Sequence, residues 1–278
     1  MSVDTTTSVT VTIDVETDWG GRLSVGPGNC QGIEEGIPYL LHLLDELKIK
    51  ATFFISGEVV SEYADIIRDI AEQGHEIASH GFKHSVDYGT MSKAEITEQI
   101  SKSKKILEEE IGITPIGFRA PQCRTNDYLF DVLADLGFKY DSSMVRGFLP
   151  TRYNNLSIPS EPFMKNNLRE IPISTMPYLK VPMGLLWINA MGFSTFRFLS
   201  ERIKFTDTIV LYLHPFDLLE TKSKKDFGFI ITKWYNLRSD KVKYTLESLL
   251  KYWKGNREFL VLKEVIEKNK RNKGVVFQ

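Results

Sequence analysis

The sequence predicts an α/β protein whose strands form a mainly parallel sheet or barrel. Short apolar segments alternate with amphipathic ones through the first half of the chain, and glycine or proline separates many of them. Strand, helix and strand in this order favour parallel neighbours. With 278 residues, 42% of them hydrophobic, the chain is long enough to form such a barrel as one domain.

The predicted strands are short and rich in β-branched or aromatic residues. In residues 9–15, Val and Ile alternate with Thr and Asp at a period of two, which is typical of a strand. Further strands are expected at 51–55, 75–78, 138–140, 168–173, 208–213 and 259–262.

The predicted helices fill the intervals between these strands. Residues 33–47 place leucines and isoleucines at helix spacing, and Ser92 with Glu95 forms a capping box at the start of another helix. The remaining helices are expected at 61–73, 92–111, 126–136 and 241–254. Residues 181–199 predict a buried or partly buried apolar helix; contact with a membrane surface or a lipid-linked substrate is the alternative.

We expect a single domain over residues 1–278. The barrel covers about 8–220, and the six prolines in 145–182 indicate an insertion over one face. Residues 221–278 form a helical extension. We expect no transmembrane segment, because no apolar run is long enough.

Composition argues against several classes of function. The net charge is −1, so nothing favours nucleic acid as a partner. Cys30 and Cys123 are too few for a disulfide framework or a cysteine metal cluster. The first eight residues lack the charged start and apolar run of a secretion signal, so we expect a cytoplasmic protein, with membrane association as the alternative.

Two clusters of metal-ligand type follow predicted strands. Asp14 and Glu16 lie two apart and therefore share one face of the first strand, where their charges repel unless a cation lies beside them. His80 and His84 lie four apart, and two imidazoles with a carboxylate are a known zinc layout. The alternatives are a solvated acidic turn and two ordinary surface histidines.

Three further residues complete the candidate site. His214 ends an apolar strand, where it can act as a general acid or be a satisfied core histidine. Arg119 precedes a proline-stiffened loop and can pair with Asp14, or it is an ordinary loop arginine. Asp141 can orient His214 through a ring nitrogen, or it caps a turn.

Together these five motifs resemble the polysaccharide deacetylase family, the NodB-like carbohydrate esterases of family 4. The order matches over residues 9–218: an acidic strand end, a His-x-x-x-His loop, an Arg-x-Pro loop, an Asp motif and a late strand ending in His. Within the family, Asp-Val-Glu at 14–16 and His-Pro-Phe-Asp at 214–217 are similar to the exopolysaccharide-associated branch.

The resemblance implies an incomplete, distorted TIM-like (β/α)7 barrel and a metal-dependent hydrolase that removes an N-acetyl group from an amino sugar. Its implied metal ligands are Glu16, His80 and His84, with zinc favoured and cobalt or nickel open. Its implied catalytic groups are Asp14 as base, His214 as acid, Arg119 steering Asp14 and Asp141 steering His214.

The chain departs from the family pattern at three places. Asp14-Val15-Glu16 replaces an adjacent Asp pair, so the metal carboxylate is Glu16 or Asp18, and we favour Glu16 because it shares a face with Asp14. Gln122 and Met144 replace aromatic residues, which puts the shape of the substrate in doubt. The alternative functions are a deformylase or amidohydrolase on a lipid-linked sugar or small cyclic amide, and an inactive carbohydrate-binding homologue.

Overall fold

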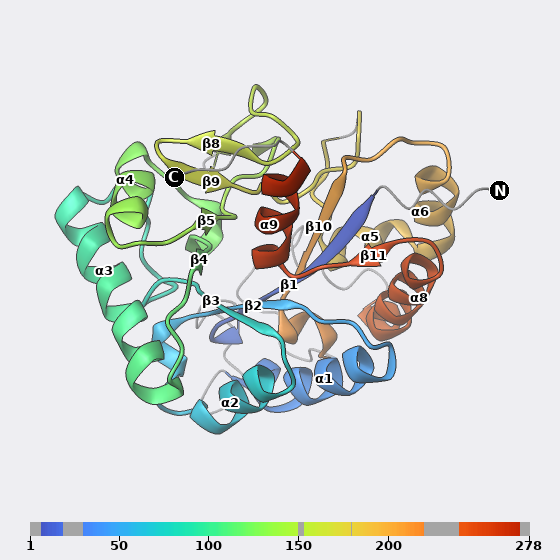
Figure 1. Ribbon diagram of the computed structural model, residues 1–278. Helices are drawn as coiled ribbons and strands as arrows, with labels where there is room; N and C mark the ends of the chain where they lie inside the picture. The colour runs from blue at the N-terminus through green and yellow to red at the C-terminus, as the bar shows by residue number, and fades with distance from the viewer. Residues whose placement is uncertain (1–6, 19–29, 150–152, 179, 220–238, 273–278) are drawn as a thin grey trace, which may run out of the picture.

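A curled, mainly parallel sheet forms the centre of the molecule in the computed structural model (Figure 1). The structure describes residues 7–18, 30–149, 153–178, 180–219 and 239–272. The strands follow the order β10-β1-β2-β3-β4-β5-β9-β8, and every neighbouring pair is parallel except β8 with β9. Their bounds are β1 (Ser8–Val15), β2 (Thr52–Ile55), β3 (Glu76–Ser79), β4 (Gly117–Phe118), β5 (Tyr140–Asp141), β8 (Phe163–Lys165), β9 (Leu168–Glu170) and β10 (Thr208–Leu213).

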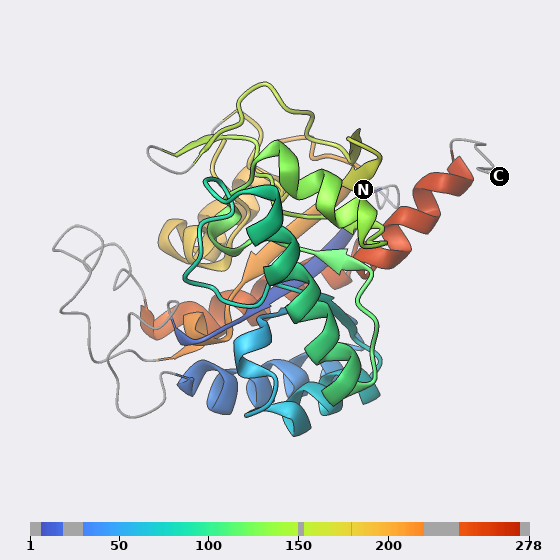
Figure 2. The same cartoon turned by 90° about the vertical axis from the view of Figure 1, so that its left-hand side faces the viewer.

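Helices cover the outer face of this sheet (Figures 1 and 2). They are α1 (Ile37–Glu46), α2 (Ala64–Glu72), α3 (Lys93–Ile106), α4 (Asp127–Asp135), α5 (Leu185–Met191), α6 (Phe193–Ser200) and α8 (Val242–Lys254). Odd-numbered residues of β1, from Val9 to Val15, are fully buried in the apolar core on the helical side. The even-numbered Thr10, Thr12 and Asp14 therefore face the interior of the barrel.

Short helical turns link strand ends to helices. They are η2 (Gly32–Gly36), η3 (Gly57–Val59), η4 (Leu107–Ile111), η5 (Pro121–Cys123), η6 (Pro215–Leu218) and η7 (Ser239–Lys241). The predicted capping box at the start of α3 is present: the Ser92 hydroxyl accepts from Glu95 N–H, and the Glu95 carboxylate accepts from Ser92 N–H.

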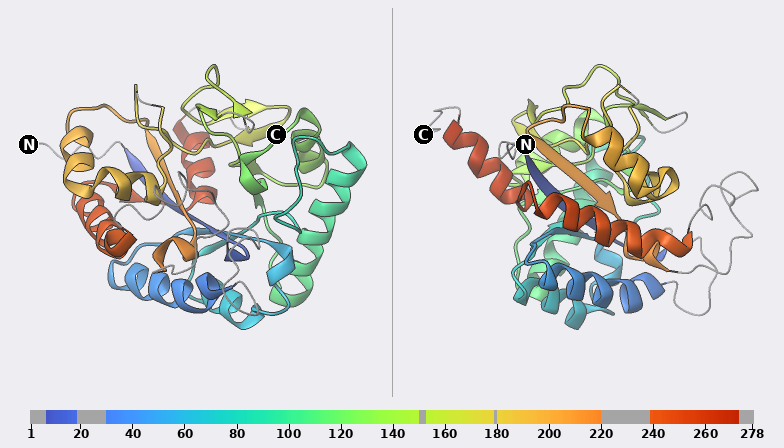
Figure 3. Two further views of the ribbon diagram at one scale, coloured as in Figure 1. Left: turned by 180° about the vertical axis from the view of Figure 1, so that it is seen from behind. Right: turned by 90° about the vertical axis from the view of Figure 1, so that its right-hand side faces the viewer.

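The C-terminal segment closes one end of the barrel. Strand β11 (Glu258–Phe259) pairs with the first residues of β1, and α9 (Leu262–Asn272) follows it directly. Figure 3 shows α8 and α9 as consecutive helices along one side. Leu262 and Val265 of α9 pack against interior residues such as Phe54, and Lys263 N–H donates to the buried Glu76 carboxylate. The described part of the predicted extension, residues 239–272, thus packs into the barrel through α9, and residues 221–238 and 273–278 lie outside the described residues.

The structure corrects the sequence prediction at two places. The expected insertion at 145–182 contributes β8 and β9 to the central sheet, where β9 pairs with β5. A separate antiparallel pair, β6 (Phe148–Leu149) with β7 (Tyr153–Asn154), precedes them in the sequence. The apolar helix expected at 181–199 is two helices, because Gly192 adopts φ 85° and interrupts it between α5 and α6. No described helix is long and apolar enough to cross a membrane.

Candidate active site

The candidate residues meet at the carboxyl ends of the parallel strands. Asp14 and Glu16 come from the end of β1, His80 follows β3, Arg119 follows β4, and His214 follows β10. In a β/α barrel, this is the end at which active sites form. Asp14, Glu16, His80 and Arg119 are all buried, and His84 and His214 are partly exposed.

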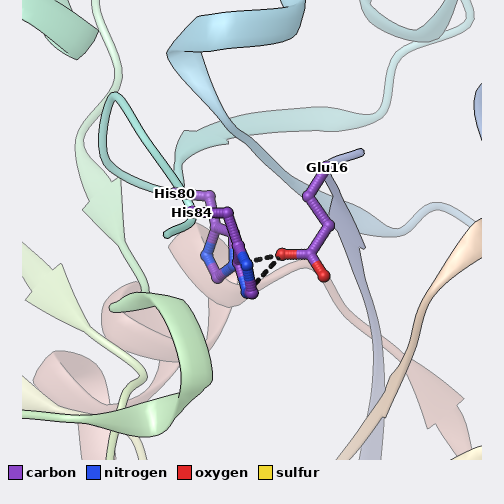
Figure 4. A group of neighbouring side chains, drawn as sticks. All are labelled: Glu16, His80 and His84. Carbon is purple, nitrogen blue, oxygen red and sulfur yellow. Dashed lines mark ion pairs between the residues drawn. The ribbon is translucent and has the colours of Figure 1, made fainter. Parts of the chain in front are cut away.

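Glu16, His80 and His84 form a group of metal-ligand type (Figure 4). One ligand atom of each lies within 4.8 Å of the others. Glu16 Oε2 is 2.6 Å from His84 Nε2 and 3.4 Å from His80 Nε2. Burial raises the pKa of Glu16, but hydrogen bonds and charge from the histidines outweigh it and lower the pKa to about 2. The carboxyl group is therefore ionised at neutral pH.

The hydrogen bond at Nδ1 of His80 determines whether Nε2 of the same ring carries a proton. His80 Nδ1 is 2.8 Å from the Arg119 carbonyl oxygen, which can only accept, so Nδ1 carries the proton. A protonated ring can donate from Nε2 to Glu16, but in the neutral ring Nε2 is a lone pair that faces the Glu16 carboxylate, another acceptor. A cation between them resolves this conflict, and a backbone carbonyl behind a ligating histidine is the usual support of a metal site. The donor set of two imidazoles and one carboxylate fits zinc.

Asp18 is placed elsewhere. The Asp18 carboxylate accepts from Gly32 N–H at 3.0 Å. Gly32 begins η2, so Asp18 stabilises the helical turn that leads into α1. Burial raises the pKa of Asp18 to about 6. Of the two carboxylates left open by the sequence, the structure places Glu16 with the histidines.

Arg119 makes the predicted ion pair with Asp14. Its Nη1 donates to Asp14 Oδ1 at 2.7 Å and to Thr12 Oγ1 at 2.9 Å, while Nε and Nη2 donate to the carbonyl and hydroxyl of Ser142. The guanidinium also stacks on the Phe54 ring, 4.2 Å from its centroid. Four donor contacts and a stacked face fix this buried side chain, and with it the direction of the Asp14 carboxylate.

The expected contact between Asp141 and His214 is wrong. His214 Nδ1 lies 3.4 Å from Asp217 Oδ2, and the same oxygen accepts from His214 N–H at 2.9 Å. The turn η6 folds Asp217 back onto His214, which brings this carboxylate closer than Asp141 on β5. Sequence reasoning missed Asp217 as a partner, because the turn that brings it to His214 is seen only in the structure.

The His214 ring is held on its faces as well as at its edge. Phe216 stacks on it with centroids 4.5 Å apart, and Tyr212 meets it edge-on at 5.7 Å. Its Nε2 lies 4.0 Å from Glu16 Oε1, so the ring points toward the ligand group. Burial lowers the pKa of His214, but Asp217 and the carboxylates of Glu16 and Asp14 outweigh it and raise the pKa to about 9.

Asp141 belongs to a different network. Its carboxylate accepts from the Ser143 hydroxyl at 2.6 Å and from Ser143 N–H at 3.1 Å, and Ser143 Oγ in turn accepts from Ala120 N–H. Glu170, its register partner on β9, lies beside it. Sequence reasoning missed Glu170, because nothing in a short strand inside a proline-rich segment signals a buried acid.

Residues 9–140 match the family model described as polysaccharide deacetylase. The match includes Asp14, Glu16, His80, His84 and Arg119 and covers just under half of the chain. A peptidoglycan deacetylase of Helicobacter pylori is 30% identical over 112 residues, 40% of this chain and 38% of that protein. A chitin deacetylase of Pestalotiopsis is 32% identical over 102 residues, 36% of this chain and 34% of that protein.

The family match and these relatives support membership of the polysaccharide deacetylase family. The chain spans about a third of the length of the relatives it matches.

Solved structures agree on the fold over nearly the whole chain. A proposed polysaccharide deacetylase from Mycobacterium smegmatis superposes with TM-score 0.68 at 21% identity, covering 97% of this chain and 92% of that one. An allantoinase superposes with TM-score 0.69 at 15% identity, covering 98% and 93%. At these identities the likeness establishes the distorted β/α barrel and nothing about chemistry.

Proposed function

We propose that this protein is a metal-dependent hydrolase that removes an N-acetyl group from an amino sugar in a polysaccharide or glycan precursor. One observation carries the proposal: three residues of metal-ligand type, Glu16, His80 and His84, meet at one end of the barrel. The Asp14–Arg119 ion pair lies at the same end, and His214 Nε2 is 4.0 Å from Glu16 Oε1. The relatives named as peptidoglycan and chitin deacetylases support the reaction and the substrate class.

Glu16, His80 and His84 are the proposed metal ligands. A divalent ion bound there lowers the pKa of a water molecule and polarises the acyl carbonyl. Two nitrogen donors and one oxygen donor favour zinc, and the general order of affinities leaves cobalt and nickel open.

Asp14 is the proposed general base. It is buried, and Arg119 holds one of its oxygens. The other oxygen, Oδ2, is the atom we assign to accepting a proton from the attacking water. Because Arg119 is fixed by Thr12 and Ser142, Asp14 is positioned before the substrate arrives, which lowers the cost of ordering it during the reaction.

His214 is the proposed general acid. In its protonated form it stabilises the oxyanion that develops on the acyl group and then gives its Nε2 proton to the leaving amine. Asp217 holds the opposite nitrogen and so supports the charged ring. The backbone N–H of Gln122, a residue in the left-handed region at φ 57° and ψ 13°, is the proposed second oxyanion donor.

The identity of the sugar and the place of action are finer parts of the proposal. Similarity to the exopolysaccharide-associated branch supports a glycan precursor as the substrate. If that precursor is a lipid-linked sugar, the protein must contact a membrane surface to reach it. Phe198 on α6, 54% exposed, is the apolar side chain that favours such contact. Cytoplasmic location remains our prediction from the sequence.

The test is metal content together with acetate release from N-acetylated chitin and peptidoglycan oligosaccharides, before and after chelation. About one metal per chain and chelator-sensitive acetate release support the proposal. Bound metal without acetate release directs the assay to formylated sugars and to allantoin as other amides. Sugar binding without turnover in metal-loaded protein contradicts the proposal and indicates an inactive homologue.

A further inference from the structure

Two acidic side chains lie side by side beneath the active site, and the mechanism above uses neither. Asp141 on β5 and Glu170 on β9 are register partners in the parallel ladder, so both project to the same side of the sheet. Both have no solvent exposure. Two ionised carboxylates in such a place repel each other and lose their hydration, which makes the doubly charged state costly.

Hydrogen bonding at the pair requires a proton. Two ionised carboxylates can only accept, so the neighbouring Asp141 and Glu170 can hydrogen-bond to each other only if one of them is protonated. Asp141 already receives Ser143 Oγ–H and Ser143 N–H, and Glu170 Oε1 receives Met144 N–H. Glu170 Oε2 has no donor among the described residues, so it is the oxygen free to carry the proton. Burial and the Asp141 charge both raise the pKa of Glu170 well above its usual range, in agreement with this assignment.

The pair supports the turn that holds Arg119. Ser143 bonds to Asp141 and accepts from Ala120 N–H, the residue next to Arg119. Ser142 supplies the carbonyl and the hydroxyl to which the guanidinium donates. A change in the separation of the two acids therefore moves the turn of residues 142–144, and the turn moves Arg119 and Asp14 with it.

We propose that Glu170 is a positioning residue: as a neutral acid it donates a hydrogen bond to the Asp141 carboxylate, and this shared proton fixes the 142–144 turn against Arg119. The effect on rate rests on the proposed function of Asp14, whereas the proton itself is independent of any activity. The interpretation predicts that an uncharged donor of the same shape can replace Glu170.

The first experiment is infrared spectroscopy of the wild-type chain and of Glu170→Gln at neutral pH, with Glu72→Gln on the exposed face of α2 as the matched control. If Glu170 is a neutral acid, the difference spectrum for Glu170→Gln loses a protonated-carboxyl band, whereas Glu72→Gln loses a carboxylate band. Loss of a carboxylate band in both variants overturns the proposal, whatever the activity.

The second experiment compares turnover in Glu170→Gln and Glu170→Ala. Gln keeps an acceptor for Met144 N–H and a donor for Asp141, so we expect kcat within about threefold of wild type. Ala removes both, and a shift of Asp14 by about 1 Å lowers kcat by about 10²-fold with metal content unchanged. If Glu170→Ala does not fold, Glu170→Asp breaks the contact with less loss of volume. The positioning role is refuted if Glu170→Ala or Glu170→Asp has the kcat of wild type, or if Glu170→Gln is as slow as Glu170→Ala. If the wild-type chain itself has no turnover, the proposed function is refuted, but the infrared result stays valid.

Discussion

Arg119→Lys tests whether the shape of the guanidinium, and not its charge alone, holds Asp14, the proposed general base. Lysine keeps the positive charge but has one nitrogen, so it cannot span Asp14 and Ser142 as the arginine fork does. If the ammonium stays with Asp14, the carbonyl and the hydroxyl of Ser142 each lose a donor. At about 1–3 kcal/mol for each buried group left short of a bond, the free energy of unfolding falls by about 2–6 kcal/mol. Asp14 also loses its fixed direction, so kcat falls by about 10²-fold.

Denaturant unfolding, metal content and turnover measure these effects separately. We expect a lower unfolding midpoint and lower kcat, with bound metal retained, because Arg119 contacts the ligand group only through its backbone carbonyl. Arg197→Lys, at an exposed pair on α6, is the control and should leave all three unchanged. If Arg119→Lys has the stability and kcat of wild type, charge alone suffices and the argument from the fork is wrong.

Three further predictions concern single histidines and a carboxylate. His80→Ala should lose metal and turnover together, whereas the control His42→Ala, at an exposed side chain of α1, should lose neither. Full metal content in the His80 variant would remove His80 from the proposed ligand set. Asp217→Asn should keep metal and KM but lower kcat by about 10²-fold, because His214 loses its charged partner; unchanged kcat excludes that role. Burial lowers the pKa of His75 to about 4. Between pH 6.5 and about 4, the unfolded chain therefore binds a proton at this residue that the folded chain does not bind. The free energy of unfolding falls as the pH is lowered through this range. This loss, about 1–2 kcal/mol after allowing for solvent screening, should be absent from the unfolding free energy of His75→Asn, and an equal pH slope in both proteins would count against it.

The regular elements of the first half were predictable because local signals and tertiary packing agree there. In β1, the alternation of Val and Ile with Thr and Asp corresponds to a core side and an interior side. Strand β4 was missed because two residues, Gly117 and Phe118, are too short to show a period. The sequence predicted a helical extension but did not locate α9 within it, because the apolar residues of α9 are sparse and its place depends on Glu76 and the barrel interior, which are distant in the sequence.

The site was predictable where chemistry and spacing coincide, and unpredictable where contacts join different strands. His80 and His84 carry their own signal. Glu16 shares a face with Asp14, but the period of two does not exclude Asp18, which only its hydrogen bond with Gly32 N–H places away from the histidines. The partner of His214 could not be chosen from sequence, since Asp141 and Asp217 both follow short strands and only the turn η6 decides between them. Glu170 carries no local signal, because its role depends on the register of β9 with β5.

Four buried carboxylates of the barrel interior face three kinds of partner. Asp14 has a guanidinium, Glu16 has two imidazoles that we propose hold a cation with it, and Asp141 with Glu170 has the shared proton of our proposal. In our proposals each kind of partner gives a different chemistry: a fixed base, a metal site and a neutral support. Since a buried charge without a partner costs several kcal/mol, exchange of these partners between positions is strongly disfavoured. The division of roles among four chemically similar side chains therefore follows from what each one faces.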